Sequence, residues 1–167
     1  NGTITEETSA EATELCEDIA DEGIVLLQNE DNMLPLAGGT KINVFGWSST
    51  NPVYGGTGSG SLSDAYPTVS LLEGLENAGF EVNQDLVDFY KDFRETRPTV
   101  GMWGQDWTIP EPTVEEYDKA GIFESAKAFS DTAVVVIARS GGEGADLPTS
   151  LDPAVEDNFQ DGGTFGS

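Results

Sequence analysis

Apolar residues recur at two spacings along the chain, and the first spacing to appear is that of a helix. Between residues 8 and 29 they return every three or four positions, which predicts an amphipathic helix that Ser9 or Thr8 would cap. Its apolar face is predicted to carry Ala12, Leu15, Cys16, Ile19, Gly23, Leu26 and Leu27. We therefore expect this face to pack against a core, with Cys16 as a small core residue rather than a nucleophile.

The chain after residue 40 is predicted to alternate between strands and helices. Strands are expected at 41–47 and 80–82, and helices at 68–78, 85–96 and in the second half of 114–130. The helix at 85–96 is predicted to carry its apolar residues on one inward face: Leu86, Phe89, Tyr90 and Phe93. Gly79 follows the first of these helices, as the glycine at a helix C-terminus does. Such alternation is typical of an open, mostly parallel sheet covered by helices, so the predicted fold class is α/β.

Residues 132–138 form an unbroken apolar run that is rich in Val and Ile. Such a run predicts a strand buried on both faces, as in the middle of a parallel sheet. Glycines that flank Glu143 follow the run, which places this carboxylate beyond the carboxyl end of the strand. Ligands of open α/β sheets bind outside that edge, so Glu143 is the first candidate for chemistry. The alternative is a surface turn whose acid only faces water.

The charge of the chain narrows the classes of partner. The chain has 167 residues, which are enough for one domain with a core. Its 31 acidic and 7 basic residues give a formal charge of −24. This charge argues against nucleic acid or an anionic membrane surface as the main partner. No apolar run is long enough to span a membrane. A neutral ligand such as a sugar is compatible with the charge.

The residue types present also limit the chemistry. The chain contains no histidine and one cysteine. These counts exclude an internal Ser-His-Asp or Cys-His relay, most zinc sites and an internal disulfide. A proton-transfer catalyst in this chain is therefore expected to be a carboxylate, with Tyr, Lys or Cys as less favoured alternatives. No cofactor or metal is expected. The sequence leaves the compartment open between cytoplasm and secretion.

A glycine-rich loop, Gly56-Thr57-Gly58-Ser59-Gly60, lies between a predicted strand and a predicted helix. It lacks the spacing of a dinucleotide-binding loop, and no Lys or Arg lies between Lys41 and Lys91 to meet a phosphate. The loop could bring its backbone close to a sugar, or it could simply be flexible. Trp103 and Trp107 could stack on a sugar ring or could pin an irregular segment to its own domain.

Three segments together resemble the second domain of glycoside hydrolase family 3. The first combines EGIVLLQN (residues 22–29), LPL (34–36) and the strand INVFG (42–46), and looks like the opening of that domain. The second, the glycine-rich loop, is similar to the family's glycine-serine-glycine loop. The third, VVVIARSGGEGAD (134–146), resembles the S-G-E-G-x-D segment that carries the acid/base in many members. The likeness covers roughly residues 8–150.

The resemblance implies an α/β sandwich, with Rossmann- or flavodoxin-like layers, that packs beside a TIM-type barrel. In such enzymes the barrel supplies an Asp nucleophile, and Glu143 matches the glutamate that serves as acid/base. The loops with Gly58 and Ser59, and with Ser140 and Asp146, would line the substrate cleft. A retaining glycosidase needs two carboxyls about 5 Å apart, so a cleft between two domains suits this chemistry.

The leading hypothesis is therefore part of a retaining beta-glycosidase, similar to a beta-glucosidase, with a carbohydrate substrate. Residues 1–167 would form a single sandwich domain, apparently partial, with a loosely ordered tail at 151–167 and the barrel outside this chain. Leu147 stands where many members have Arg, which removes the charge for an ion pair or sugar contact there. The alternatives are a noncatalytic carbohydrate-binding or scaffolding domain and, with less support, a nucleotide-binding protein.

Overall fold

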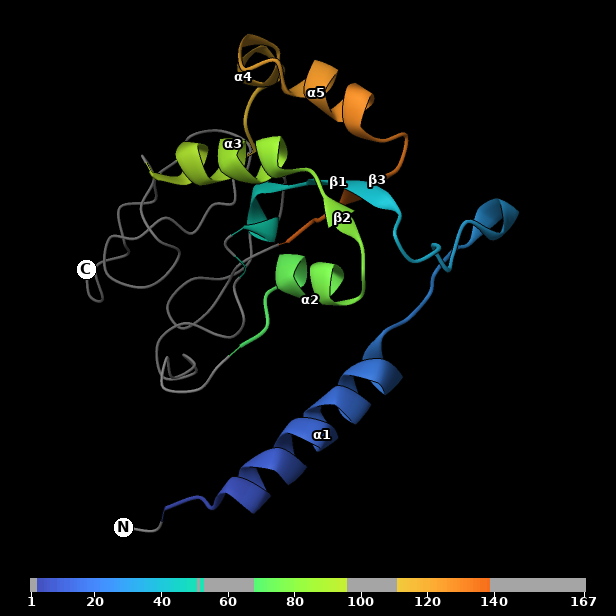
Figure 1. Cartoon of the computed structure of the whole chain (residues 1–167), viewed down its shortest axis with the longest axis vertical. Coiled ribbons are helices and arrows are strands. Elements are labelled where there is room, and N and C mark those ends of the chain that lie inside the picture. Colours follow the sequence, from blue (N-terminus) through green and yellow to red (C-terminus); the bar gives the residue numbers. More distant parts are fainter. Residues whose placement is uncertain (1–2, 51, 53–67, 96–110, 139–167) are drawn as a thin grey trace, which may run out of the picture. The chain divides into compact units, whose positions relative to one another are not determined.

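The protein forms two compact units, one that ends at Leu36 and one that begins at Ala37 (Figure 1). The first unit contains a helix and the segment that follows it, and the second contains a sheet with helices. The predicted tail at 151–167 lies outside the described residues. The computed structural model describes residues 3–50, 52, 68–95 and 111–138.

The first unit begins with α1 (Glu6–Gly23), which Thr5 caps. The Thr5 hydroxyl accepts a hydrogen bond from the backbone N–H of Thr8 at 3.2 Å, and acids in the first turn suit the helix dipole. The predicted cap at residue 8 or 9 is wrong, because an earlier threonine provides the acceptor. The predicted end at residue 29 is also wrong, since the chain becomes extended at the β-branched Ile24.

The apolar face predicted for α1 is exposed in this structure. None of the helix residues is buried; Leu15 and Ile19 are exposed, as is Leu27 beyond the helix end. Cys16 is exposed as well, so the prediction that it is a core residue is wrong here. The other helical element in the described part of this unit is the 3-10 turn η1 (Glu30–Asn32), and the apolar side chains on either side of it, such as Leu27 and Met33, are exposed as well.

The second unit is built on a parallel sheet, which confirms the predicted α/β class. Its described strands are β1 (Lys41–Phe45), β2 (Glu81–Val82) and β3 (Ala133–Val135), in the order β2-β1-β3. Both pairs of neighbours are parallel. The middle strand is therefore β1, and the carboxyl ends of all these strands point the same way.

Helices cover both sides of this sheet, with α3, α4 and α5 on one side and α2 on the other (Figure 1). They are α2 (Leu71–Asn77), α3 (Gln84–Glu95), α4 (Val114–Lys119) and α5 (Ile122–Phe129). The helices predicted at 68–78 and 85–96 are confirmed, and Gly79 follows α2 with φ +88° as expected. The segment 114–130 contains two helices rather than one in its second half, because Thr113 caps α4 and the chain turns at Gly121.

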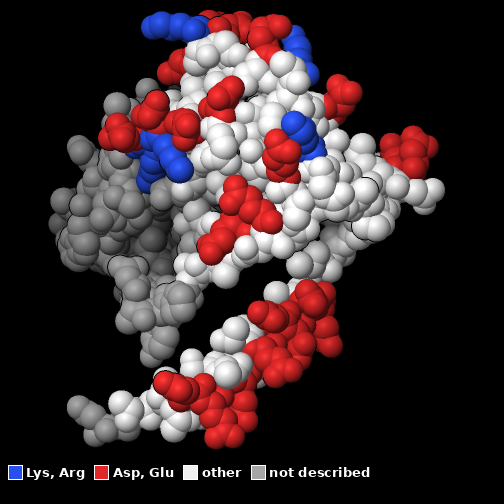
Figure 2. Space-filling view, viewed as in Figure 1, with Lys and Arg blue, Asp and Glu red and all other residues white. Residues whose placement is uncertain are grey.

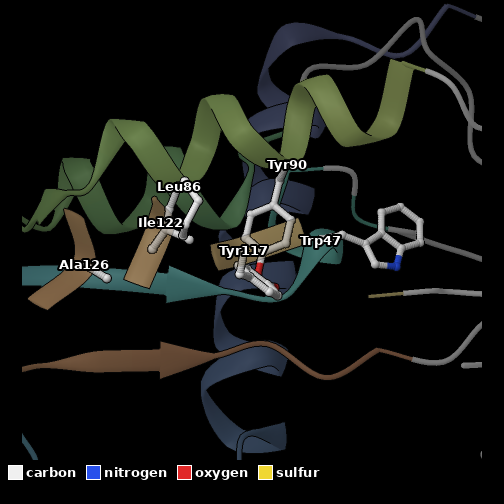
Figure 3. Packing of buried hydrophobic residues seen from close by; sticks show 6 residues of the cluster. All are labelled: Trp47, Leu86, Tyr90, Tyr117, Ile122 and Ala126. Carbon is white, nitrogen blue, oxygen red and sulfur yellow. The ribbon is translucent and has the colours of Figure 1, made fainter. Parts of the chain in front are cut away.

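The core of the second unit lies between β1 and the helices on the α3 side (Figure 3). Leu86 and Tyr90 on α3 are fully buried, which confirms the inward face predicted for that helix. Tyr117 of α4 stacks on Phe123 of α5 with ring centroids 5.1 Å apart. The buried cluster consists of Trp47, Leu86, Tyr90, Tyr117, Ile122 and Ala126.

A buried asparagine in β1 ties the sheet to α5. Asn43 donates from its side-chain amide to the carbonyls of Ala126 and Ser130, at 3.0 and 2.9 Å. Its own side-chain oxygen accepts from Asn83, which is also buried, at 2.8 Å. Because buried polar groups are costly without partners, this satisfied network fixes where α5 lies against β1.

The strand predicted to be buried on both faces is an edge strand of the described sheet. Val135 in β3 is 65% exposed and Ile137 just beyond it is 86% exposed. The strand also has a described neighbour, β1, on one side only. The prediction of a central, doubly buried strand is therefore wrong for β3, whereas Ile42, Asn43 and Val44 of β1 have that burial.

Most of the charged side chains on the face of the protein shown in Figure 2 are acidic. They lie along one side of α1 and over the visible face of the second unit, with few Lys or Arg among them. Two exposed ion pairs, Lys41–Glu81 and Lys127–Glu124, occur among the described residues. Such exposed pairs contribute little stability, so they leave the strongly acidic surface essentially unchanged.

Candidate functional site at the carboxyl edge of the sheet

The carboxyl ends of β1 and β3 meet at one edge of the sheet. Phe45 lies opposite Val135 in the register, and the next residue, Val136, donates its backbone N–H to Phe45 O at 2.8 Å. Both strands end there, and the chain leaves in the same direction from each. In open α/β sheets this is the edge outside which ligands bind.

Gly46 brings the two strands into close contact at this edge. It is buried, with φ 102° and ψ 117°, a conformation that residues with a side chain rarely adopt. A Cβ at this position would lie 2.2 Å from the carbonyl oxygen of Val136. Only glycine therefore allows β1 to end this close to the point where the chain leaves β3.

The chain after Gly46 turns into the short 3-10 helix η2 (Trp47–Ser49), all of whose residues are buried. The guanidinium of Arg94 on α3 lies over the Trp47 ring, 4.3 Å from its centroid. Trp47 Nε1 and the hydroxyls of Ser48 and Ser49 are buried without a hydrogen-bond partner in the described part of the chain. Because buried polar atoms normally have hydrogen-bond partners, we expect further polar groups to lie next to these atoms.

A carboxylate and a tyrosine accept hydrogen bonds from the backbone where β1 ends, and a second tyrosine links these two side chains. Tyr90 of α3 accepts from the N–H of Gly46 at 2.7 Å, and Glu111 Oε1 accepts from the N–H of Trp47 at 2.8 Å. The Tyr117 hydroxyl of α4 joins these groups, 3.2 Å from Glu111 Oε2 and 2.6 Å from the Tyr90 hydroxyl. We call these five linked groups the hydrogen-bonded ring; Figure 3 shows its two tyrosines pointing toward each other between α3 and β1.

The direction of the protons in this ring follows from the charge of Glu111. An ionised carboxylate only accepts, so Tyr117 donates to it and Tyr90 must donate to Tyr117. Tyr90 is then free to accept from Gly46, and every proton in the ring has an acceptor. Hydrogen bonds to an ionised acceptor are stronger than neutral ones, so the ring holds two consecutive backbone amides firmly.

The surroundings shift the pKa values of all three ionisable groups in the ring. Burial raises the pKa of Tyr90 to about 12 and also raises the pKa of Tyr117, so both hydroxyls keep their protons near neutral pH. Removal from water raises the pKa of the Glu111 carboxyl above 4.5, and its hydrogen bonds, first that from Trp47, offset part of the rise. Glu111 is exposed as a whole residue, so nearby water weakens this effect although its oxygens reach buried groups.

The residues that the sequence singles out for chemistry lie outside the described residues. These are Glu143, Gly58, Ser59, Ser140 and Asp146, together with Trp103 and Trp107. Their positions and roles stay predictions. What the structure does establish is that the glycine-rich loop follows β1 and that the Glu143 segment follows β3, which are neighbouring parallel strands.

Sequence reasoning did not find the hydrogen-bonded ring. Helical spacing placed Tyr90 on an inward face, but no signal linked it to Tyr117 or to the end of β1. Glu111 stands between two prolines, and nothing in that pattern indicates a contact with a residue far away in the chain. A buried tyrosine needs a partner for its hydroxyl, which is the one general hint the sequence offered.

Neither a metal centre nor a membrane span is found in the part of the chain that the structure describes. No three His, Cys, Asp or Glu side chains there are grouped as metal ligands would be. None of the described helices combines the length and apolar character needed to cross a bilayer.

Comparison with known proteins identifies the family. The model of the glycosyl hydrolase family 3 C-terminal domain matches residues 24–160. The chain belongs to this family. The family match covers β1, β3 and the edge where they end.

Several relatives of this family member are beta-glucosidases. Beta-glucosidase A of Butyrivibrio fibrisolvens is 35% identical over 135 residues, which are 80% of this chain and 15% of that protein. A beta-glucosidase of Ruminococcus albus is 32% identical over 128 residues, 75% of this chain and 13% of that protein. This chain therefore spans only a small part of the length of the relatives that it matches.

Solved structures of this family show the same fold. Beta-glucosidase 3B from Thermotoga neapolitana, in complex with glucose, has a TM-score of 0.60 at 34% identity, covering 82% of this chain and 19% of that one. A beta-glucosidase from Paenibacillus barengoltzii has a TM-score of 0.61 at 31% identity, covering 80% of this chain and 14% of that one. These similarities agree with the α/β sandwich predicted from the sequence.

Proposed function

We propose that this family 3 domain belongs to a retaining beta-glycosidase, similar to a beta-glucosidase, and supplies its acid/base glutamate, Glu143. The substrate would be a carbohydrate with an O-glycosidic bond, and the nucleophile would come from a TIM-type barrel domain of the same protein. Gly58, Ser59, Ser140 and Asp146 would contact the sugar. The relatives named as beta-glucosidases favour a glucoside among possible substrates.

The observation that carries this proposal is the arrangement of the two strands. Because β1 and β3 are adjacent and parallel, the segments that hold Ser59 and Glu143 leave the sheet at one edge. Open α/β sheets bind ligands outside that edge. A sugar there could be reached by an acid from one segment and by backbone amides from the other.

In the proposed reaction, Glu143 acts twice. As a carboxylic acid it gives its proton to the glycosidic oxygen while the bond to the anomeric carbon breaks and the nucleophile forms a glycosyl ester. As a carboxylate it then takes a proton from the water that attacks this ester, which releases the sugar and restores both groups. Desolvation in a closed cleft would raise the pKa of Glu143 toward this task.

The test is a comparison of leaving groups in the full-length protein that carries this chain. General acid catalysis matters most when the leaving oxygen is basic, so Glu143→Ala should lower kcat/KM for a phenyl glucoside by about 10²- to 10⁴-fold. For a dinitrophenyl glucoside, whose leaving group needs no proton, the loss should be much smaller. Azide should restore turnover of Glu143→Ala by attacking the glycosyl ester without a base.

A matched control removes an acid of the same type elsewhere. Glu115 on α4 is exposed, and Glu115→Ala should leave both substrates unaffected. If Glu143→Ala lowers kcat/KM equally for both leaving groups, or not at all, Glu143 is not the acid and the proposal fails. If the wild-type protein binds sugar but hydrolyses neither glucoside, a noncatalytic domain would be supported instead.

A further inference from the structure

The hydrogen-bonded ring lies at the end of β1, the strand next to β3, and the segment that carries Glu143 follows β3 in the sequence. On one side, Tyr90 holds the amide of Gly46. On the other side, Gly46 presses against the carbonyl of Val136, whose N–H is bound to Phe45 O. This contact lies just beyond β3, and Glu143 follows Val136 by seven residues in the sequence.

We propose that Glu111 is a positioning residue for Glu143, acting through the hydrogen-bonded ring and the contact between Gly46 and Val136. This inference rests on the proposed role of Glu143 as acid/base. Glu111 itself would touch neither substrate nor the reacting atoms. Its carboxylate would fix the two amides at the end of β1, and with them the start of the segment that delivers the proton.

The ring needs a group that accepts twice at position 111. Glu111→Gln has nearly the same shape but presents an amide NH₂ to one of two donors. If the NH₂ faces Trp47, two N–H groups oppose each other. If it faces Tyr117, that hydroxyl must turn to Tyr90, whose own proton is then left without an acceptor. Either way one link opens while the packing of the side chains is kept.

An open ring should displace the proton donor slightly rather than unfold the domain. Displacements of about 1 Å can cost about 10²-fold in rate when a catalytic group must meet its target. A misplaced acid slows the hydrolysis of substrates whose leaving oxygen is basic. It has little effect on substrates whose leaving group departs without a proton. A purely structural role predicts instead an equal loss for both substrates, because less folded enzyme lowers every activity alike.

The experiment measures kcat/KM for phenyl and dinitrophenyl glucosides with the full-length protein and its variants. For Glu111→Gln we expect a loss on the phenyl glucoside about tenfold or more greater than on the dinitrophenyl glucoside. Tyr117→Phe breaks the same ring, keeps the aromatic packing and should show the same preference. Because both act through one ring, the double variant should lose little more than either single variant.

The control is Ser70→Ala, which removes the cap of α2 on the other side of the sheet and leaves α3, Gly46 and Val136 untouched. It should lower thermal stability but affect both substrates equally. Equal losses on both substrates for Glu111→Gln and Tyr117→Phe would overturn the inference while leaving the role of Glu143 intact, provided Glu143→Ala still discriminates. If Glu143→Ala does not discriminate, the proposed function fails and this inference fails with it.

Discussion

Replacing Gly46 by alanine should be among the most destabilising single changes in the second unit. The φ of 102° alone costs an L-residue about 1–3 kcal/mol. The new Cβ would lie 2.2 Å from Val136 O, where ordinary contacts begin at 3.4 Å, so the carbonyl must move by about 1.2 Å. Such overpacking costs about 1–3 kcal/mol, and the Val136–Phe45 hydrogen bond at risk adds about 1 kcal/mol. We therefore expect a loss of about 3–7 kcal/mol in the free energy of unfolding.

Gly79→Ala separates the two causes of this loss. Gly79 also has a positive φ, +88°, but nothing lies within 4 Å of the Cβ it would gain. Its expected cost is therefore only the conformational part, about 1–2 kcal/mol. Urea unfolding, followed by tryptophan fluorescence, and hydrogen exchange of peptides from β1 and β3 would measure both variants. A difference below about 1 kcal/mol, or unchanged exchange at β1 and β3, would refute the steric reasoning.

Three further predictions concern polar side chains. Asn43→Ala should cost about 2–4 kcal/mol in urea unfolding, because the Ser130 carbonyl loses this donor, the Ala126 carbonyl keeps only the bond from Ser130 N–H, and the buried Asn83 amide loses its acceptor. Asn43→Asp should cost more at neutral than at acidic pH, since only its protonated form can donate. Thr113→Ala should cost about 1 kcal/mol through loss of the α4 capping box, and Thr113→Ser should restore most of it. Folding raises the pKa of Glu111. The free energy of unfolding of the wild type, relative to that of Glu111→Gln, should therefore be greatest below pH 4.5 and should fall as the pH rises to neutrality. A difference that grows with pH would contradict the raised pKa.

The sequence predicted the second unit well because its elements follow simple periodic patterns. The helical spacing of Leu86 and Tyr90 and the short strands between helices were enough to predict α3 and a parallel sheet. It failed where burial depends on neighbours that are distant in the chain. The apolar run at 132–138 predicted a central strand, yet β3 is at the edge of the described sheet, and a run alone carries no information about which strand pairs on each side.

The first unit shows a different limit of sequence reasoning. The apolar spacing around Leu15 and Ile19 correctly predicted a helix, but periodicity names a face and not the surface that covers it. The end of the helix was missed although Gly23 is a residue type at which helices commonly end, because the apolar spacing continues past it to Leu27. Glu143 was singled out by its place beyond a predicted strand, whereas its acid/base role and the other site residues came from resemblance to a family; all of them lie outside the described residues and stay predictions.

The hydrogen-bonded ring supplies acceptors for backbone amides that stay buried after a parallel strand has ended. When β1 stops at Phe45 and the chain turns into η2, the amides of Gly46 and Trp47 leave the ladder while they are still buried. Buried amides without acceptors cost about 1–3 kcal/mol each, so side chains from elsewhere must take over. Tyr90 comes from α3 and Glu111 from the segment before α4, and Tyr117 links the two. A local requirement of one strand end thus fixes where two helices lie relative to it, at the same edge where the proposed chemistry takes place. Changes to the ring should for that reason alter the alignment of this edge before they unfold the sheet.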